Sequence, residues 1–97
     1  MTWELTEQSL REAIAAAVQL LDAVGESYWS RRLRAVDCDG VDADAVLSLF
    51  GGMGSLNDLV IAAVNGHRVR RDEESEANQR LNRLWERMYL LARELRK

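Results

Sequence analysis

Four aspartates around a glycine form the densest group of metal-ligand side chains in the sequence: Asp37, Asp39, Asp42 and Asp44, with Gly40 between them. Hard cations bind several convergent carboxylate oxygens, so a calcium loop is the first interpretation to test. An EF-hand loop carries glycine at its sixth position and glutamate at its twelfth, whereas here the fourth residue is glycine and the twelfth is serine. We therefore expect no metal. The aspartates either belong to a solvated loop that caps a helix or form an acidic patch that binds a basic partner protein.

A second candidate site is the glycine-rich stretch at residues 51–55, which precedes a run of helical periodicity. Backbone amides at such a position cradle a phosphate in P-loops, where lysine and then serine or threonine begin the helix. Here the next two residues are leucine and asparagine, and no strand pattern precedes the stretch, which also disfavours a dinucleotide site. We expect no cofactor. Three residues are interpreted as a tight connection between helices, in which glycine permits a positive φ or close backbone approach: Gly51, Gly52 and Gly54.

His67 is the only histidine in the chain, and Cys38 is the only cysteine. A zinc site needs further histidine or cysteine ligands, and nothing local supports a nucleophilic pair of Cys38 with His67. Asn57, Asp58 and His67 are polar residues at the two ends of one expected short helix. They either organise the glycine-rich stretch or contact a ligand or partner, and the sequence leaves both interpretations open.

The composition predicts one folded domain over residues 1–97, since 47% of the residues are hydrophobic and 30% are charged. A lone cysteine suits a reducing compartment, so we expect a cytoplasmic protein. The apolar stretch at residues 13–21 follows glutamates where a signal peptide needs positive charge, and it is too short to span a bilayer. We therefore expect no membrane association.

Charge is distributed unevenly along the chain. Residues 1–66 carry ten acids against four arginines, a net charge of −6, whereas residues 67–97 carry nine cationic residues against six acids, a net charge of +3. The basic residues alternate with glutamate and aspartate and form no dense positive run. This pattern argues against a general nucleic-acid binder.

Helical periodicity predicts an all-α fold, a compact bundle of four to five helices. The first two helices are expected at about residues 6–24 and 26–36, with Ser9 and Glu12 as a capping box and Gly25 as the C-cap between them. Asp42 is expected to cap a short helix at residues 43–50. A fourth helix is expected at residues 56–64, where apolar residues recur at steps of three and four before Asn65-Gly66.

The strongest pattern predicts a long C-terminal helix at residues 73–96, whose apolar residues fall within one arc. Leu90 lies outside that arc, so we expect it to be exposed or covered by a partner protein. The seam in this helix also allows pairing with a second copy of the chain, although a seam of this length is more often an internal face. A homodimer through the C-terminal helix is therefore one expected assembly.

The motif LFGGMGSLNDLV at residues 49–60, followed by NGH at residues 65–67, resembles a family of small uncharacterised bacterial proteins. Tyr28-Trp29 with Arg32-Leu33 upstream fits the same pattern, so the resemblance covers most of the chain. It implies a helical bacterial domain. Because the family has no agreed activity, it implies no catalytic residues.

Without a catalytic constellation, the sequence favours a small acidic protein-binding module over an enzyme. An immunity protein that neutralises a cognate bacterial toxin by occlusion is the specific form we expect, because such an inhibitor needs a surface and no chemistry. The alternative is a small enzyme or ligand sensor that uses the Gly51–Ser55 stretch together with Asn57, Asp58 and His67.

Overall fold

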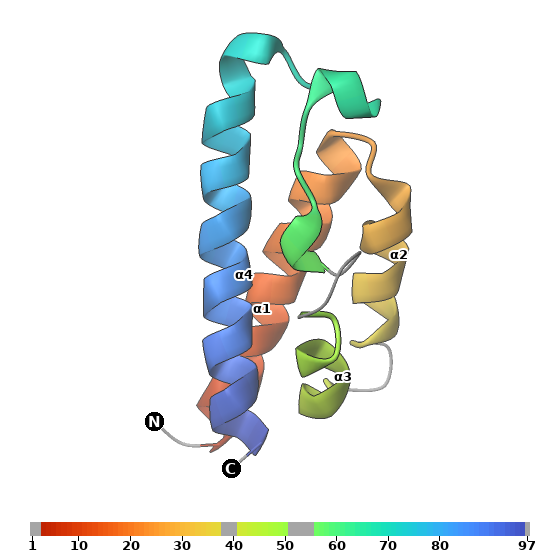
Figure 1. Ribbon diagram of the computed structural model, residues 1–97. Coiled ribbons are helices and arrows are strands. Elements are labelled where there is room, and N and C mark those ends of the chain that lie inside the picture. The colour runs from red at the N-terminus through yellow and green to blue at the C-terminus, as the bar shows by residue number, and fades with distance from the viewer. Residues whose placement is uncertain (1–2, 38–40, 51–55, 97) are drawn as a thin grey trace.

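The computed structural model describes residues 3–37, 41–50 and 56–96, and it has four α-helices and no strand in those ranges (Figure 1). The predicted all-α fold with a long C-terminal helix is confirmed. The helices are α1 (Trp3–Ala23), α2 (Ser27–Ala35), α3 (Ala43–Leu47) and α4 (Glu74–Arg96). The long helices α1 and α4 lie side by side, with α2 packed against α1 and α3 packed against α4 (Figure 1).

The core lies between the apolar stripes of α1 and α4. The stripe of α1 is completely or almost completely buried at Leu10, Ile14, Ala17 and Leu21, and that of α4 at Leu81, Trp85, Met88 and Ala92. These residues recur at steps of three and four, which places each set on one side of its helix. Each fully buried leucine contributes roughly 1.5–3 kcal/mol to folding. Because the apolar stripe of α4 packs against that of α1, the other sides of α4 are turned away from this core.

Of the three capping residues predicted from the sequence, two are confirmed and one is wrong. Asp42 caps α3, since its Oδ1 accepts hydrogen bonds from the backbone N–H groups of Asp44 at 3.0 Å and Ala45 at 3.3 Å. Gly25 follows α1 with a left-handed φ of 76°, as expected of a C-cap. The predicted cap at Ser9 is wrong, because α1 already begins at Trp3 and Ser9 lies inside it.

The predicted helix at residues 56–64 is wrong. The chain forms two single 3₁₀ turns there, η1 (Leu56–Asp58) and η2 (Ala63–Asn65), and Ala62 between them is extended with φ −156° and ψ 144°. The Asn78 side chain on α4 occupies both backbone groups of Ile61, accepting from its N–H at 2.8 Å and donating to its carbonyl oxygen at 2.8 Å. Those groups are therefore unavailable for helical hydrogen bonds. We refer to residues 59–70 as the connector.

The other predicted boundaries differ by a few residues. The helix expected at residues 43–50 ends at Leu47, and tighter turns follow it, with the N–H of Leu49 bonded to the carbonyl oxygen of Val46 at 3.1 Å and that of Phe50 to Leu47 at 3.2 Å. No helix in the described ranges is both long and apolar enough to cross a membrane.

Candidate functional site

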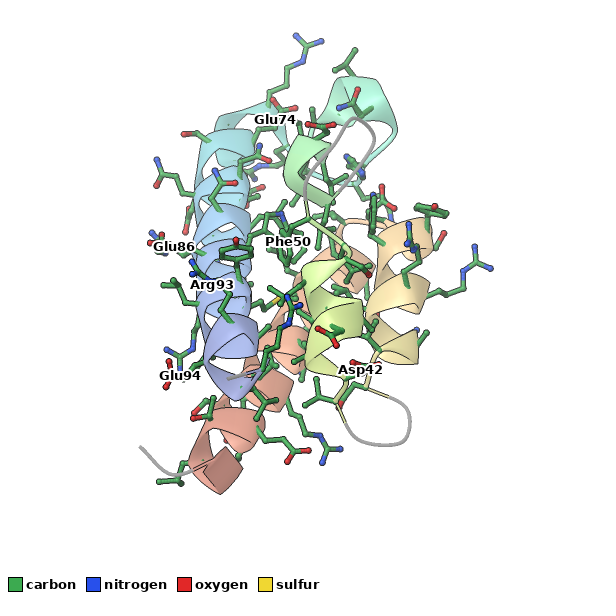
Figure 2. The ribbon with its side chains drawn as sticks, turned by 60° about the horizontal axis from the view of Figure 1, so that its bottom comes forward. Asp42, Phe50, Glu74, Glu86, Arg93 and Glu94 are labelled. Carbon is green, nitrogen blue, oxygen red and sulfur yellow. The ribbon has the colours of Figure 1, made fainter. Side chains whose placement is uncertain are left out.

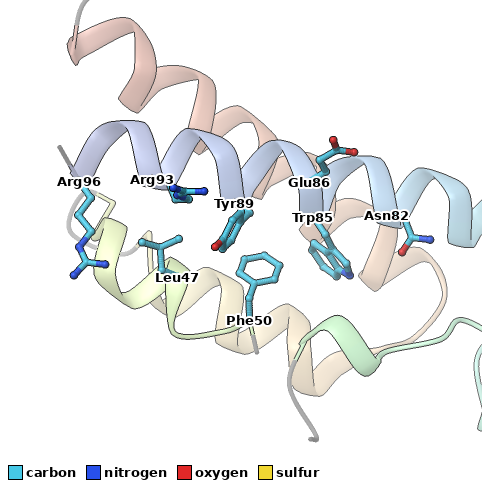
Figure 3. Close-up of a pocket in the computed structure, with 8 residues that line it drawn as sticks. All are labelled: Leu47, Phe50, Asn82, Trp85, Glu86, Tyr89, Arg93 and Arg96. Atoms are coloured by element: carbon cyan, nitrogen blue, oxygen red, sulfur yellow. The ribbon is translucent and has the colours of Figure 1, made fainter. Parts of the chain in front are cut away.

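An open groove with a volume of about 640 Å³ lies between the end of α3 and the C-terminal half of α4 (Figure 3). We refer to it as the aromatic groove. It is lined by Leu47, Phe50, Asn82, Trp85, Glu86, Tyr89, Arg93 and Arg96. Trp85 belongs to the buried stripe of α4. The other α4 residues of the groove recur at steps of three and four, so they form the side of the helix next to that stripe. Figure 2 shows Phe50 beside α4, with Glu86 and Arg93 following one another along that helix.

Three aromatic rings pack edge-to-face along the groove. The Phe50 ring lies 6.3 Å from the Trp85 ring and 5.7 Å from the Tyr89 ring, with interplanar angles of 75° and 80°. This is the arrangement that aromatic quadrupoles favour. Trp85 is 6% exposed and forms the floor, whereas Tyr89 is 39% exposed at the mouth. Among the described residues, the buried indole Nε1 of Trp85 finds no hydrogen-bond acceptor.

The charged groups at the groove are unequally neutralised. Arg96 pairs with Asp44 of α3 at 3.0 Å, which ties the end of α4 to α3. The guanidinium of Arg93 lies 5.7 Å from the centre of the Tyr89 ring, a cation–π distance, and it has no ion pair within the described ranges. The groove thus presents apolar rings and an unneutralised cation on one side.

His67 lies in a second group of polar side chains, where the connector meets α2. Its Nδ1 accepts a hydrogen bond from the backbone N–H of Ala62 at 3.1 Å, and its Nε2 lies 3.0 Å from Oε1 of Glu26. Because Nδ1 accepts, the proton of the neutral ring is on Nε2 and is donated to Glu26. The other oxygen of Glu26 caps α2 by accepting from the N–H of Trp29 at 3.3 Å. Both ring nitrogens of His67 are therefore engaged within the protein.

Two side chains of α4 complete this arrangement. Asn78 bonds both backbone groups of Ile61 and also donates to the carbonyl oxygen of Glu74 at 2.8 Å. The Oε1 atom of Glu74 accepts from the N–H of Ala63 at 2.8 Å. We refer to Glu26, His67, Glu74 and Asn78 as the His67 cluster. Three members of the cluster, His67, Glu74 and Asn78, bond backbone groups at residues 61–63, which lie outside the α-helices, and so they hold the connector in place.

A small hollow of about 260 Å³ lies beside His67. Its lining includes Asp58 and Asn65 in addition to Glu26, Trp29 and His67. This places Asp58 and His67 at one hollow, as the ligand-sensor interpretation expects. The Gly51, Gly52 and Gly54 residues of that interpretation lie outside the described residues, and Asn57 is described only as part of the backbone of η1.

The four aspartates predicted to form an acidic patch have partners inside the protein wherever they are described. Asp37 pairs with Arg11 of α1 at 2.9 Å, Asp42 caps α3, and Asp44 pairs with Arg96. Asp39 lies outside the described residues. Binding by these residues stays a prediction, and any partner would compete with bonds that already exist.

Leu90 is 54% exposed, and it lines a separate hollow of about 360 Å³ on the outward side of α4. Leu90 therefore lies outside the buried arc of α4, as the sequence predicted. In the described ranges, no group of three or more histidine, cysteine, aspartate or glutamate side chains is arranged to hold a metal ion.

The aromatic groove and the side chains that hold the connector were not predicted from the sequence. The signal for the groove was present in α4, where Trp85, Tyr89 and Arg93 follow one another at steps of four. Nothing in the local sequence marks Asn78 as a residue that bonds a distant backbone, because its partner Ile61 belongs to another segment.

A family model described as a domain of unknown function, DUF6966, matches residues 22–70. The chain belongs to the DUF6966 family. The expected relation to an uncharacterised family is therefore confirmed. No curated protein and no solved structure matches the chain. The DUF6966 residues contain Glu26 and His67 and end before α4, so most of the aromatic groove lies beyond them.

Proposed function

We propose that this protein is a protein-binding module that acts by occupying part of another protein, with the aromatic groove as its contact surface. The observation that carries the proposal is the open groove itself, where Tyr89 and Arg93 remain accessible beside Phe50. Tryptophan, tyrosine and arginine are the residues that most often dominate protein interfaces, because they combine a large apolar area with a directional polar group.

The groove is suited to holding a partner side chain. Its floor at Trp85 and its wall at Phe50 are fixed by packing, so neither ring has to be ordered when a partner binds. Preorganised contacts of this kind lose less conformational entropy on association. An apolar side chain inserted there would bury the exposed face of Tyr89, while a polar group of the partner could meet Arg93.

The specific form we propose is an immunity protein that neutralises a cognate bacterial toxin by occlusion. A stoichiometric inhibitor can be small, because it needs a contact surface and no catalytic residues. The test uses the product of the adjacent gene, since an inhibitor of this kind is normally encoded beside its target. The two proteins are co-expressed, and a tight one-to-one complex is expected.

Tyr89→Ala is expected to weaken that complex at least about tenfold, as for an interface hot spot. Tyr28→Ala is a matched control, because Tyr28 is also an exposed tyrosine with an arginine over its ring, Arg32 at 5.6 Å, but it lies on α2 outside the groove. Equal affinities for the two variants, or the absence of a complex, would count against the proposal.

The alternative function, a small enzyme or ligand sensor, has in its favour the hollow shared by Asp58 and His67. Against it, the ring of His67 is only 6% exposed and bonds through both nitrogens, which leaves it no free group for a substrate. Thermal-shift screening of nucleotides and phosphorylated metabolites tests this alternative. Stabilisation that disappears in Asp58→Ala would favour it over the binding module.

A further inference from the structure

The outward side of α4 carries a second hollow that adjoins the aromatic groove. This hollow has a volume of about 360 Å³ and is lined by Arg83, Glu86, Arg87, Leu90 and Leu91. Glu86 also lines the aromatic groove, so the two hollows meet at one residue of the same helix. Tyr89 and Leu90, both exposed, follow each other at this junction. A single partner segment can therefore contact both hollows.

The available charge on this surface is positive, although the whole protein has a net charge of −3. Three arginines outside α4 are neutralised by ion pairs: Arg34 with Asp22, Arg11 with Asp37 and Arg70 with Asp72. On α4, four arginines have no ion pair in the described part of the chain: Arg80, Arg83, Arg87 and Arg93. Arg83 and Arg87 line the outward hollow, and Arg93 lines the aromatic groove. These three arginines are exposed.

We infer that the outward side of α4 and the aromatic groove together dock an acidic amphipathic segment of the partner protein. Apolar side chains of the segment pack on Leu90 and Tyr89, and its carboxylates meet the unpaired arginines. Arginine forms bidentate hydrogen bonds with carboxylates, which fixes the orientation of the segment as well as attracting it. The inference rests on the proposed function. The segment it describes is acidic, whereas the aspartates in the sequence suggested a basic partner.

The dimensions suit a short helix. Arg83 and Arg93 are ten residues apart on α4, which corresponds to about 15 Å, or nearly three helical turns. Exposed Glu86 lies between these arginines and would repel the continuous phosphates of a nucleic acid. A peptide presents separate carboxylates that can avoid it. Glu86 thus favours a protein segment over a nucleic acid strand.

The test is a selection of random peptides, displayed on phage and long enough to form about three helical turns, on the purified full-length protein. Enriched peptides are expected to be acidic, with apolar residues at helical spacing. The synthetic form of the most enriched peptide is then measured by fluorescence anisotropy. Its affinity should fall at least about tenfold in an Arg83→Glu/Arg87→Glu variant. It should also fall with increasing salt.

An Arg31→Glu/Arg71→Glu variant is the charge-matched control. Both of its arginines are exposed and lie outside the two hollows, so its affinity should change less than about twofold, the level expected when only long-range charge is altered. Circular dichroism confirms that both double variants remain folded. Leu90→Ala, which keeps the charges, should weaken binding about threefold through lost apolar contact.

Enrichment of neutral or basic peptides, a failure to enrich any peptide, or equal sensitivity in the control would overturn the inference. Tighter binding of a single-stranded oligonucleotide than of the peptide would also overturn it. So would a dimer in light scattering that Leu90→Glu converts to a monomer, because the face would then serve a second copy of the chain. These outcomes leave the proposed function to be judged separately, by the effect of Tyr89→Ala on the complex with the adjacent gene product.

Discussion

The His67 cluster and the aromatic groove both bring together residue types that can act in catalysis or binding, but their contacts differ. In the cluster, Asn78 and the Nδ1 atom of His67 bond backbone groups of the connector, and Nε2 of His67 faces Glu26. In the groove, Tyr89 remains partly exposed and Arg93 has no ion pair among the described residues. The comparison indicates that residue type alone does not identify a site, because the same groups either hold the backbone or remain available to a partner.

The comparison predicts that changes in the His67 cluster reduce stability, whereas changes in the groove reduce binding. The largest effect is expected at Asn78. Asn78→Ala removes three hydrogen bonds and leaves both backbone groups of the fully buried Ile61 without partners. We expect the free energy of unfolding to fall by about 3 kcal/mol, since each buried group left unpaired costs on the order of 1–3 kcal/mol. Urea unfolding followed by circular dichroism measures the change.

Asn82→Ala is the matched control for this prediction. Asn82 lies one helical turn further along α4, is exposed and lines the groove. The gain in helix propensity from alanine is shared by both variants, so it cancels in their difference. Asn82→Ala should change stability by less than about 0.5 kcal/mol. An equal loss of stability in the two variants would contradict the claim that the cluster stabilises the fold while the groove does not.

The next effect is expected at His67. His67→Ala removes the acceptor for the N–H of Ala62 and leaves the Oε1 atom of Glu26, whose side chain is only 16% exposed, without its donor. We expect a loss of about 2 kcal/mol in stability and unchanged affinity for the partner. His67→Gln should recover part of the stability, because its amide has both an acceptor and a donor. Lost binding with unchanged stability would instead place His67 in a ligand site.

The smallest effect is expected at Arg93. Arg93→Gln removes the charge above Tyr89 while keeping a long polar side chain. Stability should stay within about 0.5 kcal/mol of the original protein. The affinity for the partner should fall about threefold, or roughly 0.6 kcal/mol. Isothermal titration calorimetry measures this change, and a gain in affinity would contradict a partner that brings an anionic group to the groove.

The long helices could be predicted from the sequence because they bury apolar residues at a regular spacing. Leu81, Met88 and Ala92 follow this spacing and are buried as expected. Asp42 could be identified as a cap because a capping side chain bonds backbone groups within three residues of it.

The connector could not be predicted because contacts distant in sequence determine its backbone. Leu56, Leu59, Val60 and Val64 have the spacing of an amphipathic helix, yet Val64 is 89% exposed and Leu56 is fully buried. The hydrogen bonds from Asn78 and His67 replace helical ones, and local propensity is weak compared with such tertiary contacts. The groove has the same origin, since Phe50 and Tyr89 meet only after α3 packs on α4.

The most direct test of the central claim is amide hydrogen exchange on the complex with the adjacent gene product. Exchange resolves which segments gain protection when a partner binds. Binding at the groove and on the outward side of α4 should give new protection at residues 82–96 of α4 and at the end of α3, with none in the connector. Protection confined to the connector around His67, with α4 unchanged, would contradict it.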